Sequence, residues 1–236
     1  PLLPPLRLIH RHFSSSDSVV DLIAEDYNVV PLLSRFSIPL GFGEKSIAEV
    51  CGEAGIDPDI FLLIVNFTLT GHIESARPEY ASGIVDFLFN SHSYFLTYKL
   101  PHIRVNLLAA LDAHHSDINP AIVQFFDDYV DHVKKHFAYE ERNVFPYIRA
   151  LVAQKPGATS SYSIERFKNH HDRIAEKISE LKNIILRYYV TSVPNLMYDV
   201  LVDLFTAESD LQNHNDIENF ILIPLASELE AKASKQ

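Results

Sequence analysis

The sequence predicts an all-α fold in which a small helical N-terminal domain precedes an up-and-down four-helix bundle. Hydrophobic residues make up 47% of the 236 residues, which is enough for a well-developed core. Only seven glycines are present, too few for a loop-rich all-β fold. From about Pro78 onward, apolar residues recur at the three-to-four-residue spacing of helices with one buried face. We therefore expect two domains, at residues 1–78 and 79–236.

Four long segments carry this apolar stripe, and short breaks separate them. Breaks are expected at Leu100-Pro101, at 155–157 and at Val193-Pro194, and Asn119-Pro120 is typical of a helix start. Long amphipathic helices with short connections predict an antiparallel bundle. The stripes comprise Val85, Leu88, His92 and Phe95; Ile122, Phe125, Tyr129, Val133, His136, Glu140 and Val144; Ile164, Phe167, His171, Ile174, Ile178, Leu181 and Ile185; and Val200, Leu204, Ala207, Leu211, His214, Glu218 and Ile221.

The N-terminal segment carries shorter patterns. Helices are expected at residues 46–51 and 58–70, on either side of a turn at 55–58. This arrangement resembles a helix-turn-helix, but residues 1–78 hold five Lys and Arg against ten Asp and Glu, a net charge of −5. DNA binding needs a clustered basic face, so we do not expect it here.

Six polar side chains interrupt the otherwise apolar stripes. Burying a histidine or carboxylate without a partner costs several kcal/mol, and a whole domain is stable by only about 5–15 kcal/mol. The six groups must therefore satisfy one another or share a ligand. They are His92, His136, Glu140, His171, His214 and Glu218.

Their spacing shows an internal duplication. Glu140 follows His136 by four residues, and Glu218 follows His214 by the same interval. A proline follows each histidine after ten residues, and each pair has a lone histidine 43 or 44 residues upstream. The four-residue interval puts imidazole and carboxylate on one helical face. Two such halves facing each other form a pocket with four imidazoles and two carboxylates.

This donor set suits transition metals, and two ions better than one. Zinc prefers four-coordinate sites, whereas calcium and magnesium prefer oxygen ligands throughout. If both carboxylates bridge, each ion receives two nitrogens and two oxygens. A bridging oxide or hydroxide would leave one position open on each ion, where dioxygen, peroxide or nitric oxide could bind.

Other histidines compete for these roles. His170 keeps a 44-residue spacing to His214, but His171 lies on the apolar stripe and is preferred. His132 could line the pocket or be a half-exposed helix residue, and both interpretations stay open. His114 and His115 precede a helix start and are expected to cap it or to lie on the surface. We expect the remaining histidines in loops or near the terminus; they are His10, His12, His72 and His102.

The ligand segments resemble a known family. His136-Phe137-Ala138-Tyr139-Glu140-Glu141, running on to Val144-Phe145-Pro146, is similar to the His-x-x-x-Glu-Glu-x-x-x-Phe-Pro signature of hemerythrin-like domains. His214-Asn215-Asp216-Ile217-Glu218-Asn219, running on to Ile223-Pro224, resembles its second copy. The lone His92 and His171 fall where that family has lone ligands, and Asp172 completes its usual His-Asp pair. The resemblance covers about residues 80–228 and implies two carboxylate-bridged iron ions.

The N-terminal segment adds a narrower resemblance. Phe36-Ser37-Ile38-Pro39-Leu40-Gly41-Phe42-Gly43, with Ser46-Ile47-Ala48-Glu49 and Gly55-Ile56-Asp57, is similar to the first domain of the repair-of-iron-centres family. That family is linked to restoring damaged iron–sulfur clusters. It usually has two adjacent cysteines where this chain has Gly41-Phe42, and Cys51 lies too far along to replace them.

Three functions follow as expectations. The first is a stress-response di-iron protein that supplies iron for iron–sulfur cluster repair, with apo iron–sulfur proteins as partners. The second, favoured by the missing cysteines, is a protein that binds or senses dioxygen or nitric oxide. The third is a di-iron oxidoreductase. A formal charge of −11, the single cysteine and the lack of long apolar runs predict a cytoplasmic protein that binds neither nucleic acid nor membranes. A homodimer is left open.

Overall fold

The computed structural model describes residues 11–115, 117–155, 162–170, 174–192 and 194–234. These residues form helices and no strands, which confirms the all-α prediction. Backbone contacts divide the chain into two compact units, residues 1–90 and 91–236. The division lies inside helix α5 (Ala81–Tyr94), whereas the boundary expected from the sequence lies at 78/79.

In the first unit, residues 11–90 form four α-helices and the beginning of α5. The helices are α1 (Val19–Glu25), α2 (Val30–Arg35), α3 (Ile47–Ala54) and α4 (Pro58–Thr70). Ser46 and Glu49 form a reciprocal capping box at the start of α3. Gly55 ends that helix with a φ of 70°, a left-handed conformation that favours glycine. The expected pair of helices around the 55–58 turn is thus confirmed.

Aromatic packing holds this unit together. The Phe36 ring lies 5.1 Å from that of Phe61 and 4.8 Å from that of Phe87, measured between centroids. The amide of Asn66 accepts a hydrogen bond from the backbone N–H of Phe13 and donates one to its carbonyl, each at 2.9 Å. These contacts tie the segment before α1 to α4.

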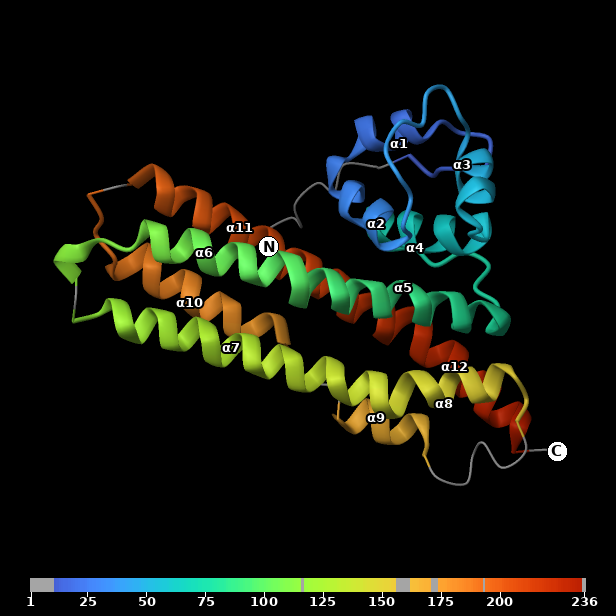
Figure 1. Ribbon diagram of the computed structural model, residues 1–236. Coiled ribbons are helices and arrows are strands. Elements are labelled where there is room, and N and C mark those ends of the chain that lie inside the picture. Colours follow the sequence, from blue (N-terminus) through green and yellow to red (C-terminus); the bar gives the residue numbers. More distant parts are fainter. Residues whose placement is uncertain (1–10, 116, 156–161, 171–173, 193, 235–236) are drawn as a thin grey trace, which may run out of the picture. The chain divides into compact units, whose positions relative to one another are not determined.

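The second unit is a bundle of long helices (Figure 1). Helices α6 (Leu100–Ala110), α7 (Asn119–Tyr139), α10 (Ile174–Tyr188) and α11 (Pro194–Ile217) contact one another in a ring, in which α6 also meets α11. Helices α8 (Phe145–Val152), α9 (Ile164–His170) and α12 (Ile223–Ala233) continue the bundle, with α12 against both α8 and α9. The four-helix prediction is confirmed.

In three places among the described residues, a π-helical turn joins two successive α-helices. These turns are Phe95–Lys99 between α5 and α6, Glu140–Val144 between α7 and α8, and Glu218–Leu222 between α11 and α12. The break expected at Leu100-Pro101 was wrong, since the chain is helical without interruption from Ala81 to Ala110. His102 therefore lies on α6 and not in a loop, with its Nε2 3.7 Å from a carboxylate oxygen of Asp203.

Asp112 ties together the end of the bundle where α6 leads into α7. Its carboxylate accepts hydrogen bonds from the backbone N–H of His114 and from the backbone N–H and hydroxyl of Ser192. The side-chain amide of Asn119 donates to its carbonyl, and its own N–H donates to the Tyr189 hydroxyl. The Ser192 hydroxyl, helped by the backbone N–H groups of His114 and Ser192, lowers the pKa of Asp112 well below its usual range.

This lowered pKa predicts acid sensitivity. A carboxylate whose pKa is depressed in the folded state stabilises the fold above its unfolded pKa of about 3.9 and loses that effect as pH falls toward the folded pKa. We expect wild-type protein to be more stable than Asp112→Asn at pH 7, and the difference to shrink between about pH 5 and pH 3. Urea unfolding at several pH values measures it. A difference that does not change with pH would contradict this assignment.

The described part of the chain contains no helix that is both long enough and apolar enough to cross a membrane.

Candidate metal centre

Helix α5 supplies His92, which is almost fully buried with both ring nitrogens next to carboxylates. Its Nε2 lies 3.1 Å from Oε2 of Glu140, and its Nδ1 lies 2.9 Å from Oε1 of Glu141. The ring stacks on Phe137, with centroids 3.8 Å apart and planes 9° from parallel. The stacking and the two carboxylates together fix the orientation of the imidazole.

Helix α7 and the π turn after it supply His136 and Glu140. The His136 Nε2 lies 2.9 Å from Oε1 of Glu140, one helical turn away. The two oxygens of Glu140 therefore face imidazoles from different helices, one from α5 and one from α7. The Glu140 side chain has no exposed surface. A fully buried carboxylate between two imidazoles is in the position that a bridging ligand requires.

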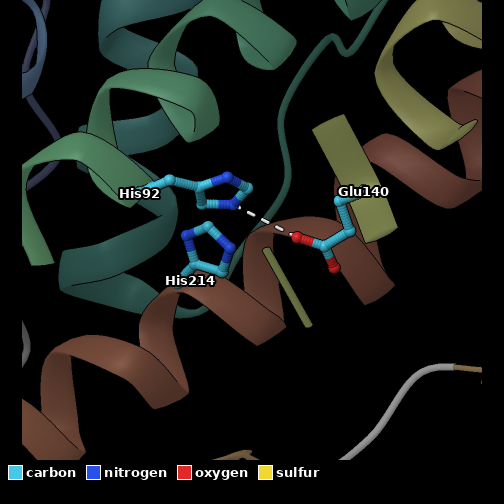
Figure 2. Close-up of side chains that lie close together, drawn as sticks. All are labelled: His92, Glu140 and His214. Atoms are coloured by element: carbon cyan, nitrogen blue, oxygen red, sulfur yellow. Dashed lines mark ion pairs between the residues drawn. The ribbon is translucent and has the colours of Figure 1, made fainter. Parts of the chain in front are cut away.

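Helix α11 and its π turn supply His214 and Glu218, both buried. The His214 Nε2 lies 3.4 Å from Oε1 of Glu218, and the His214 ring lies 5.1 Å from that of His92 between centroids. Figure 2 shows His92 and His214 side by side, with Glu140 facing them. The second copy of the sequence motif thus meets the first at one place in the core.

The donor atoms form two groups. His92, Glu140 and His214 make the first, and His136, Glu140 and Glu218 make the second. Within each group one donor atom per residue lies within 4.8 Å of the others, and all the side chains are buried. Glu140 belongs to both groups. Each group combines residues from both halves of the duplication, so neither half builds a site alone.

The chemistry of these residues fits metal ions. Among the described residues, no hydrogen bond of normal geometry reaches Nε2 of His92, the ring nitrogens of His214 or the oxygens of Glu140. A buried polar atom without a hydrogen bond destabilises the folded protein. Donors bonded to one ion at about 2.1 Å lie roughly 3 Å apart, close to the separations of 3.1 Å and 2.9 Å between the Glu140 oxygens and the nitrogens of His92 and His136. Two ions would therefore satisfy atoms that the protein itself does not.

Buried charges shift the titration of the two imidazoles nearest Glu140. Burial alone would lower the pKa of His92, but the carboxylates of Glu140 and Glu141 outweigh it and raise that pKa. Burial would also lower the pKa of His136, but the carboxylate of Glu140 outweighs this effect and raises that pKa. A metal ligand must be a neutral imidazole, so metal binding here releases protons.

The structure does not decide the predicted roles of three further histidines, His132, His170 and His171. His171 lies outside the described residues, as does Asp172, and the side chain of His170 is not described. The choice between His170 and His171 therefore stays a prediction. His132 is half-buried on α7, and its role stays open.

His114 and His115 take part in the loop at the start of α7. The His114 Nδ1 lies 2.7 Å from the Asp112 carboxylate, and the His115 Nε2 contacts the Val190 carbonyl. These contacts place both histidines at the end of the bundle where α6 leads into α7.

Sequence reasoning missed Glu141 as a contact of the site. Its carboxylate is about one-third exposed and accepts a hydrogen bond from Nδ1–H of His92, which leaves Nε2 to face Glu140. A carboxylate behind a ligand histidine fixes its tautomer and raises its basicity. The signal was available, since Glu141 is the second glutamate of the His-x-x-x-Glu-Glu segment.

Removing this charge should weaken metal binding without abolishing it. We expect Glu141→Gln to lower metal affinity by roughly 10–100-fold, the usual cost of losing such a partner. Titration of metal-free protein with cobalt(II) measures the change. Glu228→Gln is the matched control, because Glu228 pairs with Lys232 on the surface of α12. Equal affinities for the two variants would show that Glu141 does not support His92.

Comparison with known protein families gives the same picture. Residues 84–226, more than half of the chain, match the hemerythrin HHE cation binding domain. This chain belongs to the hemerythrin HHE family. The match begins in α5 and ends in α12, so it includes every described residue of the two donor groups. No curated protein matched the chain. The protein therefore carries a helical, cation-binding hemerythrin HHE domain.

Proposed function

We propose that the hemerythrin HHE domain of this protein holds two iron ions, with His92, His136, Glu140, His214 and Glu218 among the ligands and His171 as the sixth. The observation that supports two ions is that Glu140 belongs to both donor groups, with one oxygen facing each. Mixed imidazole and carboxylate donors suit iron, whereas a closed zinc site would use four ligands on one ion. Iron supplies redox chemistry and the binding of small ligands. The protein residues orient the ions and exclude bulk water.

The biological role that we propose is support of iron–sulfur cluster repair by iron delivery. The support comes from the two resemblances in the sequence together with the donor groups. Six protein ligands shared between two ions leave coordination positions through which iron can exchange. The partners would be apo iron–sulfur proteins.

The test is transfer of iron under anaerobic conditions. Protein loaded with equal amounts of ferrous and ferric iron is mixed with an apo iron–sulfur protein and sulfide, and cluster absorption is followed. We expect wild-type protein to restore the cluster and Glu140→Gln to fail because it cannot be loaded. If fully loaded wild-type protein transfers no iron, the delivery role is wrong even though the metal site is real.

Sensing of dioxygen or nitric oxide is a second candidate, and the state of the single thiol favours it. Cys51 is fully buried in α3, and burial raises its pKa to about 11. At Gly41, one of the two positions where related domains have cysteines, φ is 101°, a conformation that a cysteine rarely adopts. The N-terminal unit therefore offers no reactive thiol to accept iron. Reversible optical changes with dioxygen or nitric oxide, without iron transfer, would favour this function.

Cys51 itself should be unreactive. With a pKa of about 11, only roughly one molecule in ten thousand carries the thiolate at pH 7. We expect an aromatic disulfide reagent to leave Cys51 unmodified in folded protein and to modify it completely in guanidinium chloride. Cys51→Ser should transfer iron as well as wild-type protein does. Rapid modification of the folded protein would show that α3 opens and that the thiol is available.

A further inference from the structure

The three π-helical turns of the bundle share one feature, which is a proline at the same distance. Each turn contains five residues, and the proline is the second residue after it: Pro101 after Phe95–Lys99, Pro146 after Glu140–Val144, and Pro224 after Glu218–Leu222. Two of the turns begin at the glutamates of the metal centre. Three repeats of one spacing indicate a common cause.

The cause is the missing N–H of proline. In an α-helix the residue at this position would donate to the carbonyl four residues earlier, and proline cannot. That carbonyl belongs to the middle residue of each π turn, namely Thr97, Arg142 and Phe220. The residue just before each proline donates instead to the carbonyl five residues earlier, as a π turn requires. These bonds run from Leu100 to Phe95, from Phe145 to Glu140, and from Ile223 to Glu218.

The wider turn changes which side chains face the site. In a regular α-helix, Phe145 would point about 140° away from Glu140, because five residues turn the helix by roughly 500°. The π turn adds one residue to a single turn and brings Phe145 round to the same side as Glu140. There its ring is buried and lies 5.2 Å from the His92 ring, with planes 21° apart. Ile223 holds the corresponding place after Glu218 and is also buried.

We propose that Pro146 and Pro224 are positioning residues for the metal centre: they hold open the π turns that seat its two carboxylates, Glu140 and Glu218. A proline inside a helix destabilises it. The prolines thus make the helices less stable, but they hold the ligands of the site in position. This inference rests on metal binding by these glutamates, but its stability component concerns the metal-free protein alone.

The test compares Pro146→Ala and Pro224→Ala in the full chain. Alanine restores the missing N–H and allows the π turn to close into a regular α-helix. We expect metal-free Pro146→Ala to melt several degrees higher than wild type and its cobalt(II) affinity to fall by roughly 10–100-fold, with altered absorption bands of bound cobalt(II). Pro224→Ala should behave likewise and provides an independent variant from the other half of the site.

Pro120→Ala is the matched control. Pro120 lies in the first turn of α7, where a missing N–H removes no helical hydrogen bond. Its cobalt(II) affinity and spectrum should equal those of wild type. Unchanged cobalt(II) affinity in both test variants would overturn the proposal. A melting temperature that falls together with affinity would also overturn it, because that result would mean general damage. If wild-type protein binds no metal at all, the proposed function fails, and the stability of the metal-free variants still reports on the π turns.

Discussion

Glu140→Gln should reduce bound iron from two ions per chain to nearly none. Glu140 is the residue shared by both donor groups, and its two oxygens lie 2.9 Å and 3.1 Å from imidazole nitrogens on two helices. Glutamine keeps the size of the side chain but replaces one carboxylate oxygen with an amide nitrogen, which cannot bind metal while it keeps its protons. We expect affinity to fall by at least about 100-fold, more than the loss of a supporting partner costs. Metal analysis after anaerobic loading measures the stoichiometry.

The contrast with Glu218→Gln makes this prediction specific. Glu218 belongs to one of the two groups, and the group of His92, Glu140 and His214 remains complete without it. We expect Glu218→Gln to retain about one ion per chain on this basis. Two ions in Glu140→Gln would show that the carboxylate is structural. Equal losses in both variants would show that both glutamates bridge to the same extent.

Removing the metal should lower the thermal stability of the wild-type protein by a large amount. Ions that bind only the folded chain stabilise it by about 2.7 kcal/mol when free metal is 100 times the dissociation constant. For a chain of this size each kcal/mol corresponds to about 2–4 °C. Two ions should therefore raise the melting temperature by at least about 10 °C.

Calorimetry with and without a chelator measures this shift, and Glu140→Gln is its control. The variant should melt at nearly the same temperature with and without metal, because it has lost the shared ligand. A wild-type melting temperature that does not respond to the chelator would contradict the presence of bound ions. A response of equal size in both proteins would show that the chelator acts elsewhere.

The sequence by itself determined the helical fold and most of the residues that line the candidate centre. Periodicity places His136 with Glu140, and His214 with Glu218, on buried faces one turn apart, since a four-residue interval has this meaning in any α-helix. The matched spacing in the two halves identified the duplication. The structure brings five of the six predicted ligands into the two groups.

Tertiary structure alone decided which residues meet. The period of a helix fixes the face on which a side chain lies but not the neighbour against which that face packs. The sequence thus could not show that each donor group combines both halves, or that Glu141 reaches His92 on another helix. It also could not show that the helix continues through Pro101, since a proline usually breaks a helix. Here a π turn precedes Pro101, Pro146 and Pro224, and the chain stays helical through all three.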